Sequence, residues 1–399
     1  MTHHSHFRNF ITPEAPQFLS TVSGDIANVT APPFFLAPIS VVEVGSCWTE
    51  RPSTFISATL ETDPEARALK VLQWILCSLR SQFYVGEGDK AGLKKPLNAF
   101  LGEIFEGQWR DEKATAKMIA EQVRTSDSSK FIKVPQQKFL YLTPEEGEGY
   151  TRVEMSFSGN LNIKQTGHAI VHLDKYDEHC LIPMPNCKVR GFLSASLYPE
   201  LYGTYYLTSS TGFISEITFS GKGFFSGVRN SFEAKMYKAG DKKKEPLYAA
   251  RGQWNDKFII TDARGIKDPI TCEPGKTPAA KPEMKSLEEQ DSWETRKAWQ
   301  HVLAALGEND MQNIVKEKTK VEEAQRAMRK EEISKGTVWE PKFFTSSEDS
   351  ALFQKLAKET PWKLLAERTK GVWTFDQVKA KEAVKPYHGE LTPLGVLRE

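Results

Sequence analysis

Apolar residues recur every three or four positions between Asp63 and Phe83, which is the spacing of one face of an α-helix. Asp63 stands directly before Pro64. This pair is typical of a helix start, because aspartate caps the first turn and proline fits the first helical position. The segment therefore predicts an amphipathic helix that packs into a core. Its apolar positions are Ala68, Val71, Leu72, Ile75, Leu76 and Leu79.

Between about residues 98 and 265 the pattern changes to short stretches in which apolar and polar residues alternate. These stretches are rich in aromatic and β-branched residues and are separated by Gly, Pro and Asn, as strands are. We expect a large antiparallel sheet that curls or closes into a barrel, because an open sheet of this size would leave exposed edges. The strands are expected at Lys138–Leu142, Thr151–Phe157, His168–Leu173, Thr204–Leu207, Ile214–Phe219, Ser231–Tyr237 and Lys257–Ile260.

Helical spacing returns after the sheet region, beyond a polar surface crossing that is rich in Pro and Lys at residues 263–285. A glycine follows each of the two periodic segments, and glycine commonly ends helices. The helices are expected at about 287–306, ended by Gly307, and at about 310–335, capped by Asn309 or Asp310 and ended by Gly336. Sequence beyond Thr337 is only weakly periodic.

The N-terminal segment 14–40 also carries an apolar stripe, and its opposite side is small and mostly uncharged. The prolines within residues 31–38 exclude a helix there and favour extended backbone. Three interpretations stay open: a lid over an apolar cavity, a helix on a membrane surface, or an arm packed on the body. The stripe consists of Phe18, Leu19, Val22, Ile26 and Val29.

The composition of the 399 residues is that of an ordinary globular protein, with 39% hydrophobic and 26% charged residues. A net charge of +1 gives no overall field that would attract nucleic acid, so we expect no nucleic-acid partner. No apolar run reaches the ~18 residues of a membrane span, and the start lacks a signal peptide's apolar stretch. The five scattered cysteines form no C-x-x-C pair and are expected to be reduced thiols of a cytoplasmic protein.

Two groups of charged residues could bind an anion. Lys95 stands in the segment Lys94-Lys95-Pro96-Leu97-Asn98, where Pro96 stiffens a turn and the lysine presents a point charge. Lys318, Glu322 and Arg326 lie four residues apart on the predicted second helix, so they share one face. Each group alone is more typical of a solvated surface than of a binding site, and the helical trio gains meaning only beside Lys95.

Metal and catalytic chemistry have weaker support. His168, His172, Asp174, His179 and Cys180 are residue types that ligate metals, but the alternation around them indicates a strand, and we predict no metal site. The glycines of residues 221–227 lack the spacing of a dinucleotide loop, and no nucleophile elbow or Walker loop is present. We expect no catalytic residues and no cofactor.

Several motifs together resemble the oxysterol-binding protein family. Lys94-Lys95-Pro96-Leu97-Asn98, followed by residues 100–107, is similar to the family signature K-K-P-L-N-P-x-L-G-E-x-F-x-G. Glu121-Gln122-Val123 resembles the opening of the E-Q-V-S-H-H-P-P fingerprint. The motifs span residues 18 to about 340 in family order. Further similarities lie at residues 31–34, 38–40, 165–168, 224–227, 287–290 and 326–332.

The resemblance implies an α+β fold: a large, nearly closed antiparallel β-barrel around a hydrophobic tunnel, with an N-terminal lid and flanking helices. It covers the lipid-binding domain alone, as in short-form members. The implied organisation is an N-terminal arm and lid at 1–40, a helical segment at 41–97, a barrel core at 98–265, and a C-terminal helical subdomain and tail at 266–399. By resemblance, sterol lies in the tunnel near Phe18, Phe35, Val41, Trp48, Phe83 and Gln165.

Many family members also hold phosphatidylinositol 4-phosphate in this tunnel. By resemblance, its headgroup site here comprises Lys95, Asn98, Lys318, Glu322 and Arg326. The fingerprint differs, because Thr125 and Ser126 stand where the family has two histidines, and Asp127 stands where it has a proline. Loss of two donors and the added repulsion would cost about 2–5 kcal/mol, so we expect phosphoinositide binding to be weakened or lost.

These features predict a sterol-binding and non-vesicular sterol-transfer protein without catalysis. The alternative is a binder or sensor of another lipid, including a phosphoinositide, in the same tunnel. We expect a monomeric cytoplasmic protein that associates with membranes peripherally and transiently. Phe343 and Phe344 weakly resemble the two-phenylalanine motif with which lipid-transfer proteins dock on a receptor, but the acidic lead-in is missing and a buried pair is favoured.

Overall fold

The structure is a computed structural model of the chain. It describes residues 35–84, 93–124, 136–143, 146–157, 159–191, 197–221 and 227–396. Within these ranges, no helix has the length and apolar character needed to cross a membrane. The stripe Phe18–Val29 that was interpreted as a lid lies outside the described residues.

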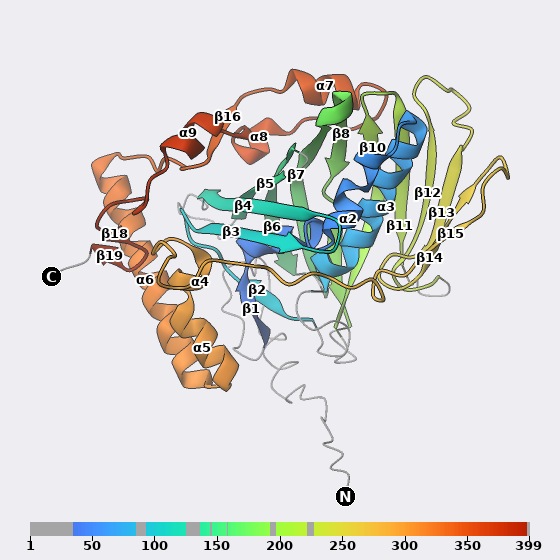
Figure 1. The fold of residues 1–399 in the computed structure, drawn as a ribbon. Helices are drawn as coiled ribbons and strands as arrows, with labels where there is room; N and C mark the ends of the chain where they lie inside the picture. Colours follow the sequence, from blue (N-terminus) through green and yellow to red (C-terminus); the bar gives the residue numbers. More distant parts are fainter. Residues whose placement is uncertain are drawn as a thin grey trace, which may run out of the picture.

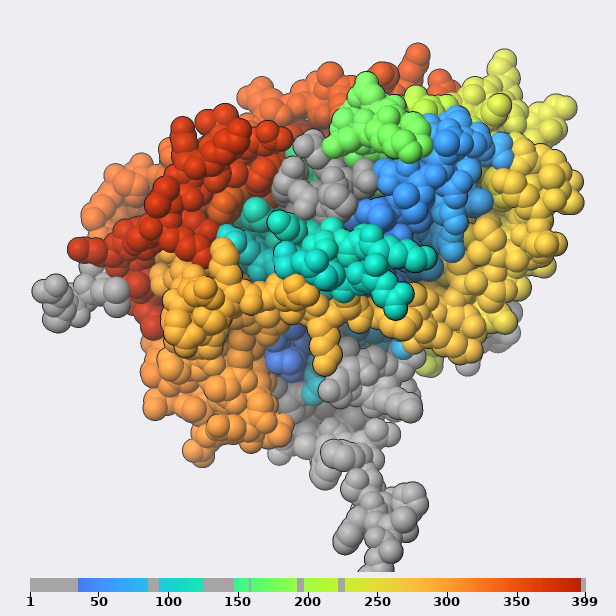
Figure 2. Space-filling model, viewed as in Figure 1, coloured from blue at the N-terminus to red at the C-terminus, as the bar shows by residue number. Residues whose placement is uncertain are grey.

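The helix α3, Pro64–Phe83, matches the predicted amphipathic helix. The Asp63 carboxylate accepts hydrogen bonds from the backbone N–H groups of Glu65 and Ala66, at 3.4 and 3.2 Å, which caps the first turn. The buried face of α3 is wide and contacts two clusters. Val71, Trp74 and Ile75 pack in one core cluster, and the neighbouring row around Leu72 packs in another. The remaining side of the helix lies at the molecular surface (Figures 1 and 2).

A 13-stranded antiparallel sheet curves around α3, and this confirms the predicted fold class. Twelve strands follow the order β15-β14-β13-β12-β11-β10-β8-β7-β6-β5-β4-β3, while β9 pairs with β10 and β7. The strands are β3 Ile104–Arg110, β4 Thr115–Arg124, β5 Gln136–Thr143, β6 Glu146–Phe157, β7 Leu161–Leu173, β8 Glu178–Pro183, β9 Asn186–Arg190, β10 Tyr198–Ser209, β11 Phe213–Ser220, β12 Ser231–Lys238, β13 Tyr248–Gln253, β14 Phe258–Asp262 and β15 Ile270–Cys272.

The sheet curves so that β3 and β4 lie on one side of α3 and the strands β10 to β14 lie on the other (Figure 1). Along β7, Ala169, Val171 and Leu173 point into the interior cluster, whereas Ile170 between them packs on the outside. This alternation is what a strand with different layers on its two faces requires. The interior also holds the 3₁₀ helices Val41–Trp48 (η2) and Ile56–Leu60 (η3) and the helix α2, Pro52–Phe55.

The surface crossing predicted at residues 263–285 contains the strand β15, Ile270–Cys272, which pairs with β14, and only its later part follows the edge of the sheet beneath β3 (Figure 2). The backbones of Gln108 in β3 and Glu283 in the crossing exchange two hydrogen bonds, of 3.1 and 2.7 Å. The crossing therefore covers part of the exposed edge of β3, which is one way in which proteins protect sheet edges.

The first predicted C-terminal helix was wrong in its extent. Helical structure begins only at α4, Thr295–Ala298, and continues as α5, Gln300–Glu308. Residues 287–294 form turns, because the Trp293 carbonyl accepts a 3.0 Å hydrogen bond from the backbone N–H of Ile104 in β3. This tertiary contact overrides the local apolar spacing. The helix also ends at Asn309, which has a left-handed backbone conformation, rather than at Gly307.

The second predicted helix is confirmed as α6, Met311–Lys335. The Asp310 carboxylate caps it by accepting a 3.0 Å hydrogen bond from the Asn313 backbone, and Gly336 ends it with a positive φ of 65°. Helices α5 and α6 pack on each other and together form an outer layer.

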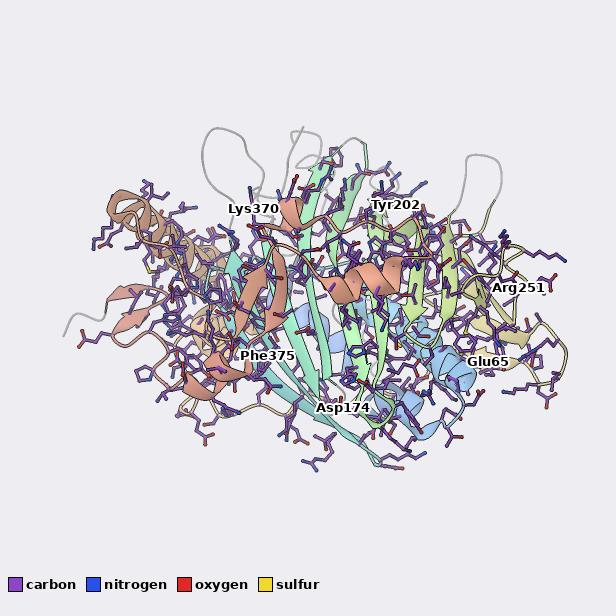
Figure 3. All side chains as sticks on the ribbon, turned by 90° about the horizontal axis from the view of Figure 1, so that it is seen from above. Glu65, Asp174, Tyr202, Arg251, Lys370 and Phe375 are labelled. Atoms are coloured by element: carbon purple, nitrogen blue, oxygen red, sulfur yellow. The ribbon has the colours of Figure 1, made fainter. Side chains whose placement is uncertain are left out.

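The segment after α6 lies on the outside of the shell, where it passes over β5 to β8 (Figures 1 and 3). Phe343 and Phe344 are only 4% and 1% exposed, so the interpretation as a buried pair is confirmed. The elements of the segment after α6 are β16 Phe344–Ser347, α7 Ala351–Ala357, α8 Ala366–Thr369, β17 Val372–Phe375, α9 Gln377–Glu382, β18 Leu391–Thr392 and β19 Gly395–Val396.

Candidate functional site

Lys95 is positioned by a small parallel sheet next to the large one. This sheet consists of β1, Leu36–Ser40, and β2, Lys95–Leu97, and it pairs Leu36 with Lys95 and Ser40 with Leu97. The proline of β2 leaves no backbone N–H to donate, which suits a short edge strand. The Lys95 side chain is largely withdrawn from water. Burial, and secondarily the charge of Lys318, lower the pKa of Lys95 to about 8.

Two of the three charged residues predicted on the second helix lie beside Lys95. Lys318 is only 6% exposed and forms an ion pair with Glu322, one turn later on α6. The Glu322 charge acts on Lys95 in the opposite direction to Lys318 and supports its protonated form. Arg326 lies on α6 one turn further and is exposed, and Asn98 is half-buried just after β2.

This cluster of Lys95, Lys318 and Glu322 has the chemistry of an anion site. Among the described residues, one glutamate balances only one of the two lysines, so a buried positive charge remains there. Burial strengthens the attraction between that charge and an anion, because the local dielectric is lower than that of water. A phosphate placed there would satisfy several ammonium donors at once.

A buried glutamate beside Ser40 of β1 was missed by the sequence analysis. Glu103 is fully buried, and its Oε2 accepts a 3.2 Å hydrogen bond from the Phe100 backbone N–H. Burial raises the pKa of Glu103 to about 7, partly offset by polar groups of Ser40, Trp299 and Thr295. The available signal was a single acidic residue within an otherwise apolar stretch, Phe100–Ile104.

The family-like fingerprint segment has a structural role in the described residues. Glu121 in β4 is fully buried and accepts hydrogen bonds from the backbone N–H groups of Lys342 and Phe343, which hold the C-terminal segment against the sheet. Burial raises the pKa of Glu121 to about 7. The next residue, Gln122, pairs its backbone with Gly102 and Glu103. Thr125 and Ser126 lie outside the described residues.

Three of the residues predicted to contact sterol lie inside the shell. Trp48 and Gln165 line the same small interior pocket, and Val41 packs against the core cluster that contains Trp48. The Gln165 amide is held in place, because its Nε2 donates a 2.6 Å hydrogen bond to the Pro185 carbonyl. The other lining residues are Val44, Gly45, Cys47, Gln82, Gly149, Tyr150, Thr151 and Met184.

The pocket has a volume of about 20 Å³, which is enough for a water molecule but not for a four-ring lipid. One of its lining residues, Thr151, has a buried Oγ1 without a hydrogen-bond partner among the described residues. The pocket thus combines a mainly apolar wall with a residue whose hydroxyl group has unused hydrogen-bonding capacity.

Phe83 and Phe35 lie elsewhere. The Phe83 ring packs against Trp254, with 6.0 Å between ring centroids, in the second interior cluster. Gln82, which the sequence analysis did not single out, lines the pocket with Trp48 instead. Phe35 is half-buried at the start of β1, one residue before Leu36, which pairs with Lys95. Phe18 lies outside the described residues. A sterol contact at Phe83 or Phe35 stays a prediction.

The geometry defines a class of protein: a curved antiparallel shell around a central helix, with an interior pocket and a separate cationic cluster. Residues 16–305 match the family model described as oxysterol-binding protein. The chain therefore belongs to the oxysterol-binding protein family.

Curated relatives support this assignment. The chain is 43% identical to the probable transporter efuK of Hormonema carpetanum over 95% of its own length and 54% of the relative's. It is 32% identical to the oxysterol-binding protein homolog C354.07c of Schizosaccharomyces pombe, over 82% of this chain and 81% of that one. It is 31% identical to protein kes1 of the same yeast, over 85% of this chain and 88% of that one.

Solved structures share the fold. The crystal structure of the Osh1 ORD domain in complex with cholesterol matches with a TM-score of 0.69 at 17% identity, and covers 94% of this chain and 89% of that one. The Osh3 ORD of Saccharomyces cerevisiae in complex with PI(4)P matches with a TM-score of 0.63 at 19% identity. This match covers 82% of the present chain and 86% of the Osh3 chain.

Proposed function

We propose that the protein binds a sterol inside its β-shell and transfers it between membranes without a catalytic step. The observation that carries this proposal is the interior pocket lined by Trp48 and Gln165, in a chain that belongs to the oxysterol-binding protein family. Support comes from the related fold of Osh1, whose ORD domain was solved with cholesterol and with ergosterol.

Hydrophobic transfer supplies the driving force. A sterol that buries on the order of 400 Å² of apolar surface gains roughly 10 kcal/mol at ~25 cal/mol/Å², before the costs of ordering. Because the present pocket is about 20 Å³, the guest must move side chains at its wall. Gln82, at the last turn of α3, is a wall residue that can move at a modest loss of packing, because it is half-buried.

A direct binding experiment tests this proposal. Full-length protein is titrated with a fluorescent sterol, and we expect saturable binding of one sterol per chain. The variant Gln82→Trp narrows the pocket from the end of α3 and should weaken binding at least tenfold. Lys330→Trp, on the exposed face of α6, is the matched control and should bind as the wild type does. Equal binding by wild type and Gln82→Trp would overturn the proposed site.

We also infer that binding of phosphatidylinositol 4-phosphate is weakened or lost. Lys95, Lys318 and Glu322 form a site suited to an anion, but Thr125 and Ser126 stand where the family has a histidine pair. Without exchange for the phosphoinositide, the protein would equilibrate sterol between membranes rather than transport it along a phosphoinositide gradient.

Extraction from vesicles that contain phosphatidylinositol 4-phosphate tests this inference. We expect little extraction by the wild type and at least a tenfold increase when Thr125→His and Ser126→His are combined. The same double variant with Lys95→Met should lose the increase, because the anion site is then incomplete. Tight extraction by the wild type that depends on Lys95 would contradict the inference.

A second candidate is a lipid other than sterol in the same pocket. The observation that favours it is the unpartnered Thr151 Oγ1, which could bind a carbonyl or hydroxyl group of many lipids. Mass spectrometry of lipids that copurify with the full chain separates the two: a sterol supports the first proposal, and a different single lipid supports the second.

For the cellular setting, we propose a monomeric cytoplasmic protein that contacts membranes peripherally and transiently. The support is family membership together with a nearly neutral chain, whose net charge of +1 gives no strong attraction to an acidic membrane.

A further inference from the structure

The hairpin between β7 and β8 carries two histidines that face each other across the strands. His172 and His179 are register partners, and their rings stack with 4.2 Å between centroids and an angle of 17° between planes. The tip of the hairpin, coloured green in Figure 2, lies on the molecular surface. Both imidazoles point away from the interior, as Ile170 does, and both are half-buried.

Two aspartates at the hairpin tip complete the cluster. The Asp177 Oδ1 lies 3.1 Å from the His172 Nε2, and the Asp174 Oδ1 lies 2.9 Å from the Nδ1 of the same ring. Asp174 stands at the tip of the hairpin (Figure 3). Donor atoms of His172, Asp177 and His179 all lie within 4.8 Å of one another. The Asp177 side chain is 90% exposed, so it can close this distance at little cost.

We propose that this hairpin binds one divalent transition-metal ion of the zinc class, with His172 Nε2, His179 and Asp177 as ligands and Asp174 as the residue that orients His172. Two imidazoles and one carboxylate are a donor set that suits such ions. The Asp174 contact fixes the ring so that Nδ1 donates to the carboxylate and Nε2 keeps its lone pair for the metal, an arrangement that recurs around metal-bound histidines.

The strand geometry explains which nearby residues belong to the site. Cys180 follows His179 directly and therefore points to the opposite face, where it is completely buried in the core. His168 shares the face of His172 but is covered by the rings of Phe353 and Trp362. Of the metal-ligating residue types that stand together in the sequence, His172, Asp174 and His179 therefore lie at the surface site. His168 and Cys180 are core residues.

Space next to the histidines leaves room for further ligands of the ion. His172 and His179 line a cavity of about 250 Å³ between the outer face of the sheet and the C-terminal segment. Glu148 and Gln377 are among the other lining residues, and their polar atoms can hold water molecules. A three-residue site with an open coordination position can bind water or a ligand group in this cavity.

Zinc titration by calorimetry tests the proposal, in a full-length background in which His3, His4 and His6 are replaced by Ala to remove binding by the N-terminus. We expect one Zn²⁺ per chain. His179→Ala should weaken binding at least tenfold, and Asp174→Asn should weaken it tenfold to a hundredfold, because the ring loses its orienting partner. His301→Ala, on the exposed side of α5, is the matched control and should leave the affinity unchanged.

A cobalt-substituted sample gives a second measurement. We expect the d–d absorption of Co²⁺ bound to the wild type, and its loss in the double variant His172→Ala and His179→Ala. Circular dichroism of the variants checks that the fold is intact. The proposal is overturned if Zn²⁺ fails to bind at one equivalent, or if the double variant folds and binds Zn²⁺ as tightly as its parent.

Discussion

At the residue scale, the most informative side chain is Lys95, because the fold buries its ammonium group and burial makes the charged form energetically costly. Burial and the neighbouring Lys318 lower its pKa from an ordinary value of 10.5 to about 8. The protonated lysine is therefore less favourable in the folded than in the unfolded chain. An anion bound at the cluster would compensate for this cost, which links the charge to a binding role.

The same shift makes a prediction about stability. Between about pH 8 and 10.5 the unfolded chain binds more protons than the folded one, so the Lys95 penalty is present at pH 7 and disappears as the pH rises. Lys95→Met should therefore raise the free energy of unfolding by about 1–2 kcal/mol at pH 7, and the gain should shrink towards pH 10.5. Urea denaturation at several pH values measures this.

Lys117→Met is the control for this prediction, since Lys117 is exposed on β4. Its effect should be within ~0.5 kcal/mol at every pH, as is usual for surface substitutions. A Lys95→Met variant that is less stable than the wild type at pH 7 would show that the lysine is stabilised by its neighbours instead.

At the element scale, the connection between β2 and β3 depends on one glycine. Gly102 has a positive φ of 82°, which residues with a side chain rarely adopt, and a Cβ there would lie 2.1 Å from the Trp339 ring. Trp339 itself packs on Trp293, so the ring has little freedom to move away. The glycine thus lets the chain turn beneath a tryptophan from the C-terminal segment.

This arrangement allows a matched comparison of two glycines. Gly212, in the turn between β10 and β11, has nearly the same φ of 87°, but a methyl group added there would have no heavy atom within 4 Å. Both Gly102→Ala and Gly212→Ala incur the cost of the backbone conformation, about 1 kcal/mol. Only Gly102→Ala adds a clash, worth about 1–3 kcal/mol more. The midpoint of urea unfolding should therefore be lower for Gly102→Ala than for Gly212→Ala. Equal midpoints would contradict the contact with Trp339.

The elements also show where sequence patterns suffice. Local signals predicted α3 and α6 well, because Asp63, Asp310 and Gly336 act through the nearest turn of backbone. Residues 287–294 were predicted wrongly, since the Trp293 carbonyl bonds to Ile104, which is far away in the sequence, instead of continuing a helix. Capping is a local interaction and can be seen in a sequence, whereas a tertiary hydrogen bond cannot.

The candidate site, too, could be predicted only in part from local sequence patterns. The helical spacing of Lys318 and Glu322 predicted that they share a face, but only their match to family motifs placed them beside Lys95. The end of α3 shows the limit of such reasoning. Neighbouring residues on a helix point about 100° apart, so Gln82 faces the pocket while Phe83 faces Trp254. The family resemblance pointed to the phenylalanine, and no local pattern indicates which way the end of the helix is turned.

At the scale of the whole molecule, the shell consists of a sheet with separate layers on its two sides. Inside, η2 and α3 form the wall of the pocket, and outside, α5, α6 and the C-terminal segment cover the sheet. Because η2 and α3 line the pocket and α5 and α6 do not, a guest in the pocket should act mainly on the inner layer. This separation predicts where a bound sterol changes the protein.

Hydrogen exchange measured by mass spectrometry tests that prediction. Saturating sterol should slow exchange in η2, Val41–Trp48, and in the last turn of α3, while α5 keeps its rate. Binding at 100 times Kd stabilises the folded state by about 2.7 kcal/mol, so the melting temperature should rise by roughly 2–5 °C. In Gln82→Trp a tenfold weaker affinity leaves the same sterol concentration at 10 times Kd, so the stabilisation should fall to about 1.4 kcal/mol and the rise in melting temperature should be about half as large. Slower exchange confined to α5 and α6 would place the ligand outside the shell, since only residues that contact or enclose a guest lose their local opening motions.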